Sequence, residues 1–547
     1  MWLADKGCGE TVEGVWQASF EGPVNSKVIR KIERCGKELT LWSRNKFGNI
    51  RRELVKKRKE LNRAEQQAVR TGLSFRVVLL KKEINSLMGK EERMWRQRSR
   101  FTYIKEGDRN TRFFHSRATL RKRRNCIKNI RNQANEWCTG QEQIADTFVE
   151  YYKDLFTSLT PEVNPEALDS IPQVVTGEMN EILVGEFQAW EVEAALNQMA
   201  PLKAPGPDGM PPLFYQNFWH LVKGDVTQTV LHFLNSGSLP NPLNHTFITL
   251  IPKTKNPERV SEFRPISLCN VLYKIFSKVL ANRLKRVLPH IISEHRSAFI
   301  KGRLITNNIL VAYETLHYMK NHNSGSSGFM ALKLDISKAY DRVEWSFLKN
   351  VMVLMGFDER WVALVMECIT TVTYSILING EPMGNIKPSR GIRQGDPLSP
   401  YLFLMCFDGL HRMIQKAACN GDIKVVSICR NGPKLTHLFF ADDSLLFCRA
   451  TIQECRKIMG ILAAYEKVSG QKLNKEKTAI FFSKSTTLDH QAQIMEELGV
   501  SELKQYEDYL GLPALVGRNK KASFGKIKQR VWKRMQGWEG KLLSQAG

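Results

Sequence analysis

The stretch KLTHLFFADDSLLFCRA, residues 434–450, carries two adjacent carboxylates in an otherwise apolar run. The apolar flanks on both sides of Ala441, Asp442 and Asp443 predict a β-hairpin that is buried along its strands and exposes its acidic tip. Adjacent carboxylates repel one another unless a cation lies beside them. Asp is also common in turns for conformational reasons, so this stretch alone leaves a plain hairpin turn open.

A second stretch, FMALKLDISKAYDRVEW (329–345), adds another carboxylate. MALKLDI has strand composition and SKAYDRVEWSFLKNVM has helical spacing, so Asp335 is predicted where a strand turns into a helix. If the 434–450 hairpin packs beside this strand, Asp335, Asp442 and Asp443 converge. Three carboxylates in one place favour bound divalent cations, and hard oxygen ligands suit Mg²⁺. Two such ions about 3.5 to 4 Å apart are typical of phosphoryl transfer.

The segments between and before these stretches predict further elements. APGPDGMPP (204–212) predicts an ordered loop between helices, TFITLIPK (246–253) a strand and NHNSGSSG (321–328) a flexible connector. In residues 262–288, apolar side chains recur at three- and four-residue spacing, which predicts an amphipathic helix. These side chains are Leu268, Val271, Leu272, Ile275, Val279 and Leu280.

Positive charge dominates the chain, with 81 Lys and Arg against 55 Asp and Glu among 547 residues. This excess favours a polyanionic partner, nucleic acid first and an anionic membrane surface second. Residues 51–63 and 91–130 predict helices with a broad basic face, broken near YIKEGDRNTRFFH (103–115). Most basic runs are solvated helix surfaces. Here aromatic residues interleave with them, which suits contact with phosphates and bases: Trp95, Phe101, Tyr103, Phe113 and Phe114. The run Arg121, Lys122, Arg123 and Arg124 is predicted to bind nucleic acid.

Two classes of protein are disfavoured by the sequence. No apolar run approaches the length of a membrane span and the N-terminus lacks a secretory pattern, which predicts a soluble, intracellular protein of the nucleus or cytoplasm without a membrane partner. The eleven cysteines form no CxxC pair, so free thiols are expected rather than a zinc site.

Three motifs, taken together and in this order, closely resemble the reverse transcriptases of non-LTR, LINE-type retrotransposons, in particular those of the plant lineage. They are LKLDISKAYDRVEW (332–345), RGIRQGDPLSPYLFLMCFDGL (390–410) and FFADDSLLF (439–447). The resemblance extends to KAPGPDG (203–209), to residues 251–285 and 293–310, to SGQKLNKEKT (469–478) and to YLGLP (509–513).

The resemblance implies an α+β right-hand polymerase, with a palm sheet, helical fingers and a truncated thumb, preceded by a basic helical segment. The expected divisions are an N-terminal segment at 1–160, whose start is similar to the tail that follows an endonuclease, fingers and palm at 161–515, and the start of the thumb at 516–547. The chain is expected to be part of a longer polyprotein, without endonuclease and RNase H domains.

The resemblance also implies roles for single residues. Asp335 corresponds to the first metal-binding aspartate, and Asp442 and Asp443 to the catalytic pair, holding two Mg²⁺ ions or Mn²⁺ as a substitute. Tyr340 corresponds to the residue under the incoming sugar that excludes a 2′-OH. The other correspondences are Gln394 and Gly395 for nucleotide and template contact, Lys253 and Arg264 for the triphosphate, Lys477 for the leaving pyrophosphate, and Tyr509, Leu510 and Gly511 for the primer grip.

The activity expected from the resemblance is RNA-directed DNA polymerisation, in which a primer 3′-OH attacks a dNTP opposite an RNA template. Arg296, Lys301 and Asn307 depart from the family, which more often has Gln, Pro and Asp there, in the region that handles the template. Two alternatives stay open: a catalytically inactive, retrotransposon-derived fragment that binds RNA, and a polymerase of the group II intron maturase type.

Overall fold

The computed structural model describes residues 2–99, 109–159, 168–293, 298–300, 302–322, 328–429, 432, 434–441, 443–474, 477–500, 508–513, 521 and 524–536. Several positions considered above lie outside these residues. They are Asp442, Arg296, Lys301, Phe101, Tyr103 and residues 323–327 of the expected connector.

Four antiparallel strands form a sheet, here called the carboxylate sheet, in the order β11-β12-β5-β14. Its strands are β5 (Phe329–Leu334), β11 (His437–Phe440), β12 (Asp443–Arg449) and β14 (Ala479–Phe482). Side chains alternate between its faces: Leu332 packs in the main core, which includes α17 (Ser399–Cys419) and α18 (Ile452–Ser469), whereas Ala331 packs against α14 (Ile305–Asn321) on the other face. The predicted hairpin and the strand before Asp335 are thus confirmed.

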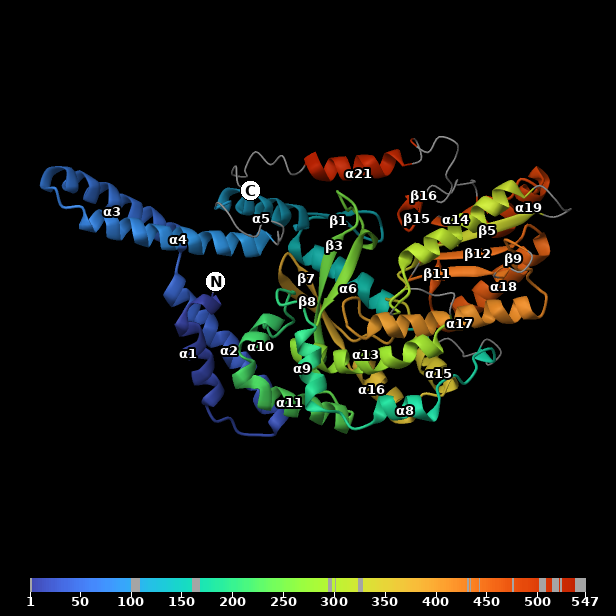
Figure 1. The fold of residues 1–547 in the computed structure, drawn as a ribbon, viewed down its shortest axis with the longest axis horizontal. Helices are drawn as coiled ribbons and strands as arrows, with labels where there is room; N and C mark the ends of the chain where they lie inside the picture. The colour runs from blue at the N-terminus through green and yellow to red at the C-terminus, as the bar shows by residue number, and fades with distance from the viewer. Residues whose placement is uncertain are drawn as a thin grey trace.

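A second, mixed sheet has the order β4-β3-β7-β8, with β3 and β7 parallel (Figure 1). Its strands are β3 (His245–Pro252), β4 (Phe263–Leu268), β7 (Thr373–Ile378) and β8 (Glu381–Ile386). Helix α6 (Gln141–Phe156) covers one face through Phe148, Tyr152 and their neighbours. The strand predicted at 246–253 is confirmed as β3.

The helix predicted within 262–288 is confirmed from Val271 onward, but it begins later than predicted and is more deeply buried. Leu268 lies in strand β4, and the helix α13 (Val271–Ile291) begins only after it. Pro265 fixes its own φ and pushes Arg264 toward extended backbone, which favours the strand. In α13 even Lys274 and Arg283 are buried, so this is a core helix enclosed on most sides rather than an amphipathic surface helix.

The helix predicted after Asp335 begins later than expected. The chain forms β6 (Ile336–Ser337) and a turn, and helix α15 spans Trp345–Met355. Backbone groups of the intervening residues bind other segments: the Ala339 carbonyl accepts from Gln471 Nε2 at 2.8 Å, and the Tyr340 carbonyl from Ile392 N at 2.9 Å. These tertiary hydrogen bonds replace those of a helix.

The N-terminal helices fall into two groups. Helices α1 (Lys6–Gln17) and α2 (Val24–Phe47) contribute to the same core as α11 (Trp219–Ser236) and α13, and Lys31 on α2 forms a 2.7 Å ion pair with Asp225 on α11. Helices α3 (Ile50–Thr71) and α4 (Phe75–Ser99) pair with each other and project from the body as an arm (Figure 1). The predicted basic helices are therefore confirmed, and α5 (Thr111–Asn125) follows the arm.

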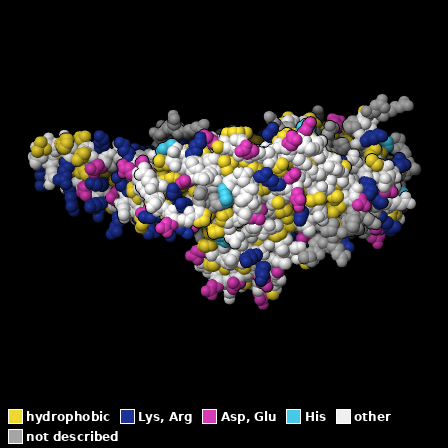
Figure 2. Space-filling view, turned by 90° about the horizontal axis from the view of Figure 1, so that it is seen from below, with side chains coloured by type: hydrophobic (Ala, Val, Ile, Leu, Met, Phe, Trp, Pro, Cys, Tyr) yellow, Lys and Arg dark blue, Asp and Glu magenta, His cyan; other side chains and the backbone are white. Residues whose placement is uncertain are grey.

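Basic side chains line one side of the arm, and hydrophobic side chains gather at its outer end (Figure 2). The exposed hydrophobic residues there include Val69, Leu73, Phe75 and Val78.

The remaining elements complete the chain. They are η1 (Trp2–Ala4), β1 (Ile130–Arg131), β2 (Trp137–Cys138), α8 (Gly177–Val184), α9 (Ala189–Asn197), α10 (Pro212–Asn217), α12 (Asn241–Asn244), η2 (Val260–Glu262), α16 (Glu359–Thr370), β9 (Val426–Ser427), β10 (Lys434–Leu435), β13 (Lys472–Leu473), α19 (Leu488–Leu498), β15 (Asp508–Tyr509), β16 (Leu512–Pro513) and α21 (Gly525–Gln536). The predicted loop at 204–212 lies between α9 and α10. No helix within the described ranges is both long and apolar enough to cross a bilayer. The predicted divisions near residues 160 and 515 stay predictions.

Candidate active site

Two of the three predicted carboxylates come together at the end of the carboxylate sheet. Ser444 of β12 pairs with Leu334, the last residue of β5, so Asp443 and Asp335 are the next residues of the two segments at this end of the sheet. Phe440 pairs with Asp443, and Ala441, which follows β11, has φ +53°. The sheet thus brings the two segments that carry these carboxylates together at one end.

A lysine lies directly on the first of these carboxylates. Lys477 Nζ is 3.3 Å from Asp335 Oδ2, and the two side chains are 67% and 40% exposed. The exposed carboxylate of Asp335 therefore accepts a cation, as a metal-binding group must. The segment that carries Lys477 is held beside Asp335, because Asn474 N, three residues before Lys477, donates to the Asp335 carbonyl at 2.8 Å.

The two cations predicted to bind the triphosphate lie on the mixed sheet, near this pair. Lys253 follows β3, and Arg264 on β4 is the register partner of Ile251. Lys253 Nζ donates to the Ser261 carbonyl at 3.0 Å. Burial lowers the pKa of Lys253, the positive charges of Lys477 and Arg264 lower it further, and the carboxylates of Asp341 and Asp335 oppose them. The predicted cations and Asp335 thus share one electrostatic environment.

Two residues in this environment, Lys338 and Asp341, were not singled out from the sequence. Asp341 is almost fully buried, and its Oδ1 accepts from Gln394 Nε2 at 3.3 Å, while its Oδ2 has no hydrogen-bond partner among the described residues. Burial raises the pKa of Asp341 to about 6, against the opposing charges of Lys338 and Lys253. Both residues stand in the quoted stretch 329–345, but no sequence pattern distinguishes a buried carboxylate there from an exposed one.

The RQGDP segment packs backbone to backbone on strand β4. Ser267 N donates to the Gln394 carbonyl at 2.8 Å, and a Cβ at Gly395 would lie 3.0 Å from the Ser267 carbonyl oxygen. Gly395 also has φ +115°, a conformation that L side chains rarely adopt. The glycine is therefore needed for close approach to β4, which connects this segment to the strand that carries Arg264.

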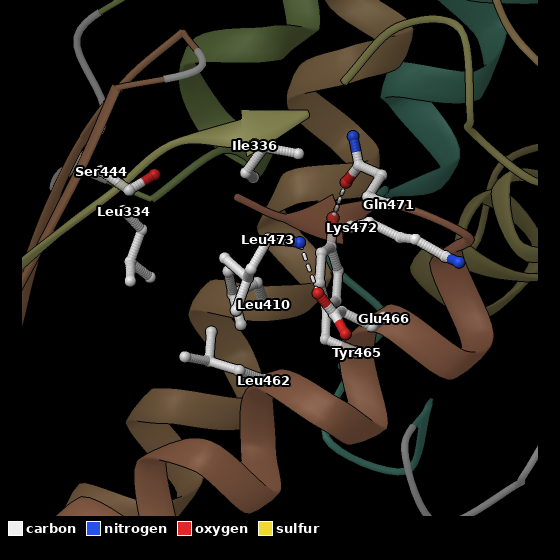
Figure 3. A pocket seen from close by; sticks show the side chains of 10 residues that line it. All are labelled: Leu334, Ile336, Leu410, Ser444, Leu462, Tyr465, Glu466, Gln471, Lys472 and Leu473. Carbon is white, nitrogen blue, oxygen red and sulfur yellow. Dashed lines mark hydrogen bonds between the residues drawn. The ribbon is translucent and has the colours of Figure 1, made fainter. Parts of the chain in front are cut away.

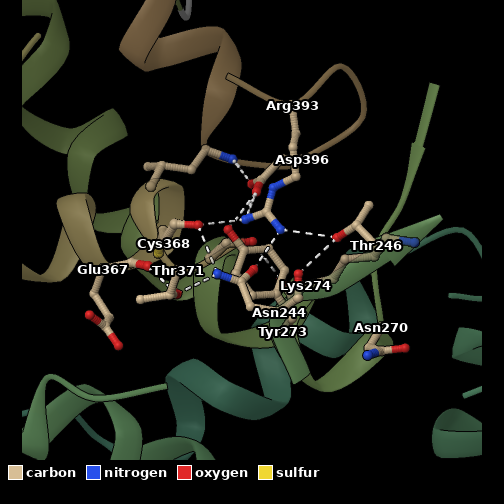
Figure 4. A network of polar contacts seen from close by, with 12 residues as sticks. Asn244, Thr246, Asn270, Tyr273, Lys274, Glu367, Cys368, Thr371, Arg393 and Asp396 are labelled. Carbon is tan, nitrogen blue, oxygen red and sulfur yellow. Dashed lines mark hydrogen bonds and ion pairs between the residues drawn. The ribbon is translucent and has the colours of Figure 1, made fainter. Parts of the chain in front are cut away.

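Arg393, next to Gln394, is the centre of a buried polar network (Figure 4). Its guanidinium pairs with Asp396 at 3.0 Å and donates to Asn244 Oδ1 at 2.6 Å and to the Cys368 carbonyl at 2.8 Å. The guanidinium also lies 4.0 Å from the Tyr273 ring centroid, and the Tyr273 hydroxyl donates to Asp396. This network attaches the segment before α17 to the mixed sheet and to α13 and α16.

The ring of Tyr340 lies on a rigid support. It stacks on Phe403 of α17, with ring centroids 4.6 Å apart and planes 12° apart. Because the Tyr340 carbonyl also accepts a hydrogen bond from Ile392 N, both the ring and the backbone of this residue are fixed. Its role under the incoming sugar stays a prediction.

The predicted primer grip forms a hairpin, β15–β16, whose turn residues Leu510 and Gly511 both have positive φ, at +50° and +87°. Tyr509 is only 1% exposed and packs with Leu438 and Leu445 of the carboxylate sheet. Burial and then the charge of Asp443 raise the pKa of Tyr509, so the hairpin lies close to the carboxylates. The exposed turn at Gly511, rather than the Tyr509 ring, is accessible to a nucleic acid.

A small pocket lies on the core side of the carboxylate sheet, between Leu334, Leu410 of α17 and Leu462 of α18 (Figure 3). In this view Tyr465 donates to Gln471 and Leu473 N to Glu466. The pocket lining is mostly apolar, so it is not suited to a nucleotide. Its hydrogen bonds fix Gln471, which in turn holds the Ala339 carbonyl.

The predicted basic run on α5 lies apart from the carboxylates. Arg121, Lys122, Arg123 and Arg124 are all exposed in the last turns of α5, beside the arm (Figure 1). The chain that follows is attached to the mixed sheet, because the Asn379 side chain forms two 2.9 Å hydrogen bonds with the backbone of Ile127.

Groups of three or more His, Cys, Asp or Glu residues able to hold a metal are absent from the described part of the chain, which does not contain Asp442. The donors present nevertheless fit a hard divalent cation, since Asp335 and Asp443 offer carboxylate oxygens at one exposed edge.

Comparisons with known proteins agree with this geometry. Residues 251–513 match the family described as reverse transcriptase (RNA-dependent DNA polymerase). A Xenopus laevis protein, the transposon TX1 uncharacterized 149 kDa protein, is 26% identical over 471 residues, which cover 82% of this chain and 34% of that protein. The Pol polyprotein of the type-2 retrotransposable element R2DM from Drosophila melanogaster is 24% identical over 71% of this chain and 35% of its own length.

A short segment is similar to a plant protein. The uncharacterized mitochondrial protein AtMg01250 of Arabidopsis thaliana is 47% identical over 68 residues, which cover 12% of this chain and 56% of that protein. The chain spans about a third of the length of the first two relatives. Residues 251–513 of this chain are therefore similar to the reverse transcriptase family, and the chain is similar to proteins of transposable elements.

Proposed function

We propose that this chain is an RNA-directed DNA polymerase that extends a DNA primer with dNTPs along an RNA template. The observation that carries the proposal is the pairing of β5 with β12 up to Leu334 and Ser444, next to Asp335 and Asp443, together with the electrostatic interaction of Lys253 with Asp335 and Arg264. Acidic groups that bind metal and cations that bind phosphate are the components of nucleotidyl transfer.

Each group has a task in this reaction. Asp335 and Asp443, with Asp442 next to it in sequence, would hold the divalent ions, and bound Mg²⁺ would supply charge stabilisation and activation of the primer hydroxyl. Lys253 and Arg264 bind the triphosphate and offset its charge. Gln394 and Gly395 contact nucleotide and template, Tyr340 supports the sugar, and Lys477 moves from Asp335 to the leaving pyrophosphate.

The finer assignments form part of the same proposal. The carboxylate sheet corresponds to the palm of a right hand and the mixed sheet with α6 to its fingers. The turn at Leu510 and Gly511 contacts the primer, and the basic run at 121–124 with the arm binds RNA. The 47% identity to an Arabidopsis protein over 68 residues supports a plant lineage, and an RNA-copying enzyme of this kind acts in the nucleus or cytoplasm.

Primer extension tests the proposal. The purified chain is incubated with poly(rA)/oligo(dT), dTTP and Mg²⁺, and compared with Asp335→Asn and Asp443→Asn. Loss of a metal-binding carboxylate removes several kcal/mol of transition-state stabilisation, so extension is expected to fall about 10³-fold or more.

Asp422→Asn is the matched control, because it makes the same chemical change at a surface ion pair with Lys457. Its extension rate is expected to equal that of the wild type. Absence of extension by a folded wild-type chain that still binds RNA would reject the polymerase and favour the inactive RNA-binding fragment.

A further inference from the structure

Lys338 lies between the two sheets, three residues after Asp335. Its ammonium donates to the Phe263 carbonyl of β4 at 3.3 Å. It lies over the rings of Tyr151 and Tyr152 on α6, 5.7 and 5.9 Å from their centroids. Phe263 precedes Arg264 in β4 and is the register partner of Pro252, which precedes Lys253. The ammonium of Lys338 is thus held at the part of the mixed sheet that carries the two predicted triphosphate contacts.

Around this ammonium lie one carboxylate, that of Asp341, and three positive side chains. No carboxylate of the described residues forms an ion pair with Lys338. Burial lowers its pKa to about 8; Asp341 opposes this shift, whereas Lys253, Arg342 and Arg264 add to it. A half-buried cation among like charges is unfavourable unless an anion binds there.

The backbone at Lys338 is strained as well. Its φ is +53°, a conformation that costs free energy for a residue other than glycine and occurs preferentially at ligand-binding sites. The turn is maintained by hydrogen bonds from Asp341 N and Arg342 N to the Lys338 carbonyl. The fold therefore fixes the direction of this side chain toward the mixed sheet.

We propose that Lys338 is a further positively charged contact for the triphosphate of the incoming nucleotide, acting with Lys253 and Arg264. This inference rests on the proposed polymerase function and extends it to a residue of the turn after Asp335. The weak contacts with the Phe263 carbonyl and the tyrosine rings hold the ammonium in position, and a phosphate oxygen replaces them on binding. Asp341, buried behind the turn, keeps the lysine protonated before the nucleotide arrives.

A purely structural role would predict a different result. If Lys338 only ties the turn to β4 and α6, its neutral replacement by a hydrogen-bond donor of similar length should keep function. Lys338→Gln retains a donor for the Phe263 carbonyl but removes the charge, and Lys338→Arg retains the charge. Lys349→Met, on the exposed side of α15, removes a positive charge elsewhere in the domain and serves as control.

The experiment has two independent measurements on the full chain. Steady-state primer extension gives KM for dTTP and kcat, and calorimetric titration with inorganic tripolyphosphate and Mg²⁺, without primer or template, gives Kd. Because a charge-assisted hydrogen bond contributes about 1.5–3 kcal/mol, Lys338→Gln is expected to raise both KM and Kd about tenfold or more while kcat changes about twofold or less. Lys338→Arg should restore both within about threefold, and Lys349→Met should change neither.

The outcomes separate this inference from the proposed function. If the wild type is active and Lys338→Gln leaves KM and Kd unchanged, the inference is overturned and the proposed function still stands. The same conclusion follows if Lys338→Gln lowers kcat and thermal stability without changing Kd. If the wild type does not extend primers, the function fails, and the titration still decides whether Lys338 binds a triphosphate. Absence of tripolyphosphate binding by the wild type would overturn the inference as well.

Discussion

Arg393 and Lys338 both reach the mixed sheet, yet their environments are opposite. Arg393 is neutralised by Asp396, and its donors bind Asn244 and the Cys368 carbonyl. Lys338 meets a carbonyl and two aromatic rings among positive neighbours. A paired, hydrogen-bonded charge stabilises the fold, whereas a charge without its counter-ion is maintained for a ligand. The comparison therefore separates the residues that hold the site together from those that bind the substrate.

The largest effect is expected from breaking the paired network. Arg393→Met leaves the buried Asp396 carboxylate without its cation, and loss of one partner of a buried pair costs about 3–5 kcal/mol. The free energy of unfolding, from urea or guanidinium denaturation, should fall by that amount. Arg393→Met/Asp396→Asn should recover part of it, because no charge is then left uncompensated. Equal losses in the single and double variants would assign the effect to packing instead of charge.

Substitution of Asp341 is expected to raise the free energy of unfolding, by less than the loss expected at Arg393. The raised pKa of about 6 in the folded protein, against an ordinary value of 3.8, means that the wild type loses stability as pH rises through this interval. Asp341→Asn keeps an oxygen acceptor for Gln394 and removes the charge. At pH 7 the variant should be about 1–3 kcal/mol more stable than the wild type, with the difference vanishing near pH 4.

Denaturant unfolding at pH 4, 5, 6 and 7 checks this prediction. Asp396→Asn is the matched comparison, since the same change at the paired carboxylate should destabilise the protein throughout that range. A loss of stability in Asp341→Asn at pH 7 would show that Asp341 is paired as effectively as Asp396.

The smallest expected effect is the change of protein stability with pH that results from titration of Lys338. Its pKa of about 8 lies below the ordinary value of 10.5, so the folded protein carries an unfavourable charge at pH 7 that disappears as pH rises. Relative to Lys338→Gln, the wild type should gain up to about 2.5 kcal/mol of stability between pH 7 and pH 10. Paired denaturation curves at the two pH values measure it. A stability difference that is the same at both would contradict the unpaired state of this lysine.

The sequence predicts the elements whose pattern is local. Strand β5, the β11–β12 hairpin and β3 follow from apolar runs and alternation, and Asp335 lies at the predicted strand end. The late start of the helix after Asp335 has a tertiary cause, because Gln471 and Ile392 bind backbone groups of that turn. In β4, the extended backbone favoured by Pro265 prevails over the three- and four-residue spacing of apolar residues that included Leu268.

Prediction of the candidate site from the sequence is limited in the same way by tertiary contacts. The resemblance of motifs directs attention to Asp335, Asp443, Lys253 and Arg264, and the structure brings their segments together. Lys338 and Asp341 depend on burial and on neighbours from distant segments, such as Tyr151 and Gln394. Charge alone gives no sign of burial, so these two residues could be recognised only in the folded chain.

The shared core of the N-terminal helices has a consequence for synthesis of the protein. Helices α1 and α2 are synthesised before the helices that cover their apolar side, α11 and α13, which end at Ser236 and Ile291. Until those helices emerge, side chains such as Val28, Ile32 and Leu39 have no native partner to exclude water. Between the synthesis of α2 and that of α13, the growing chain is therefore exposed to premature association through these side chains, and dependence on a chaperone during that interval is expected.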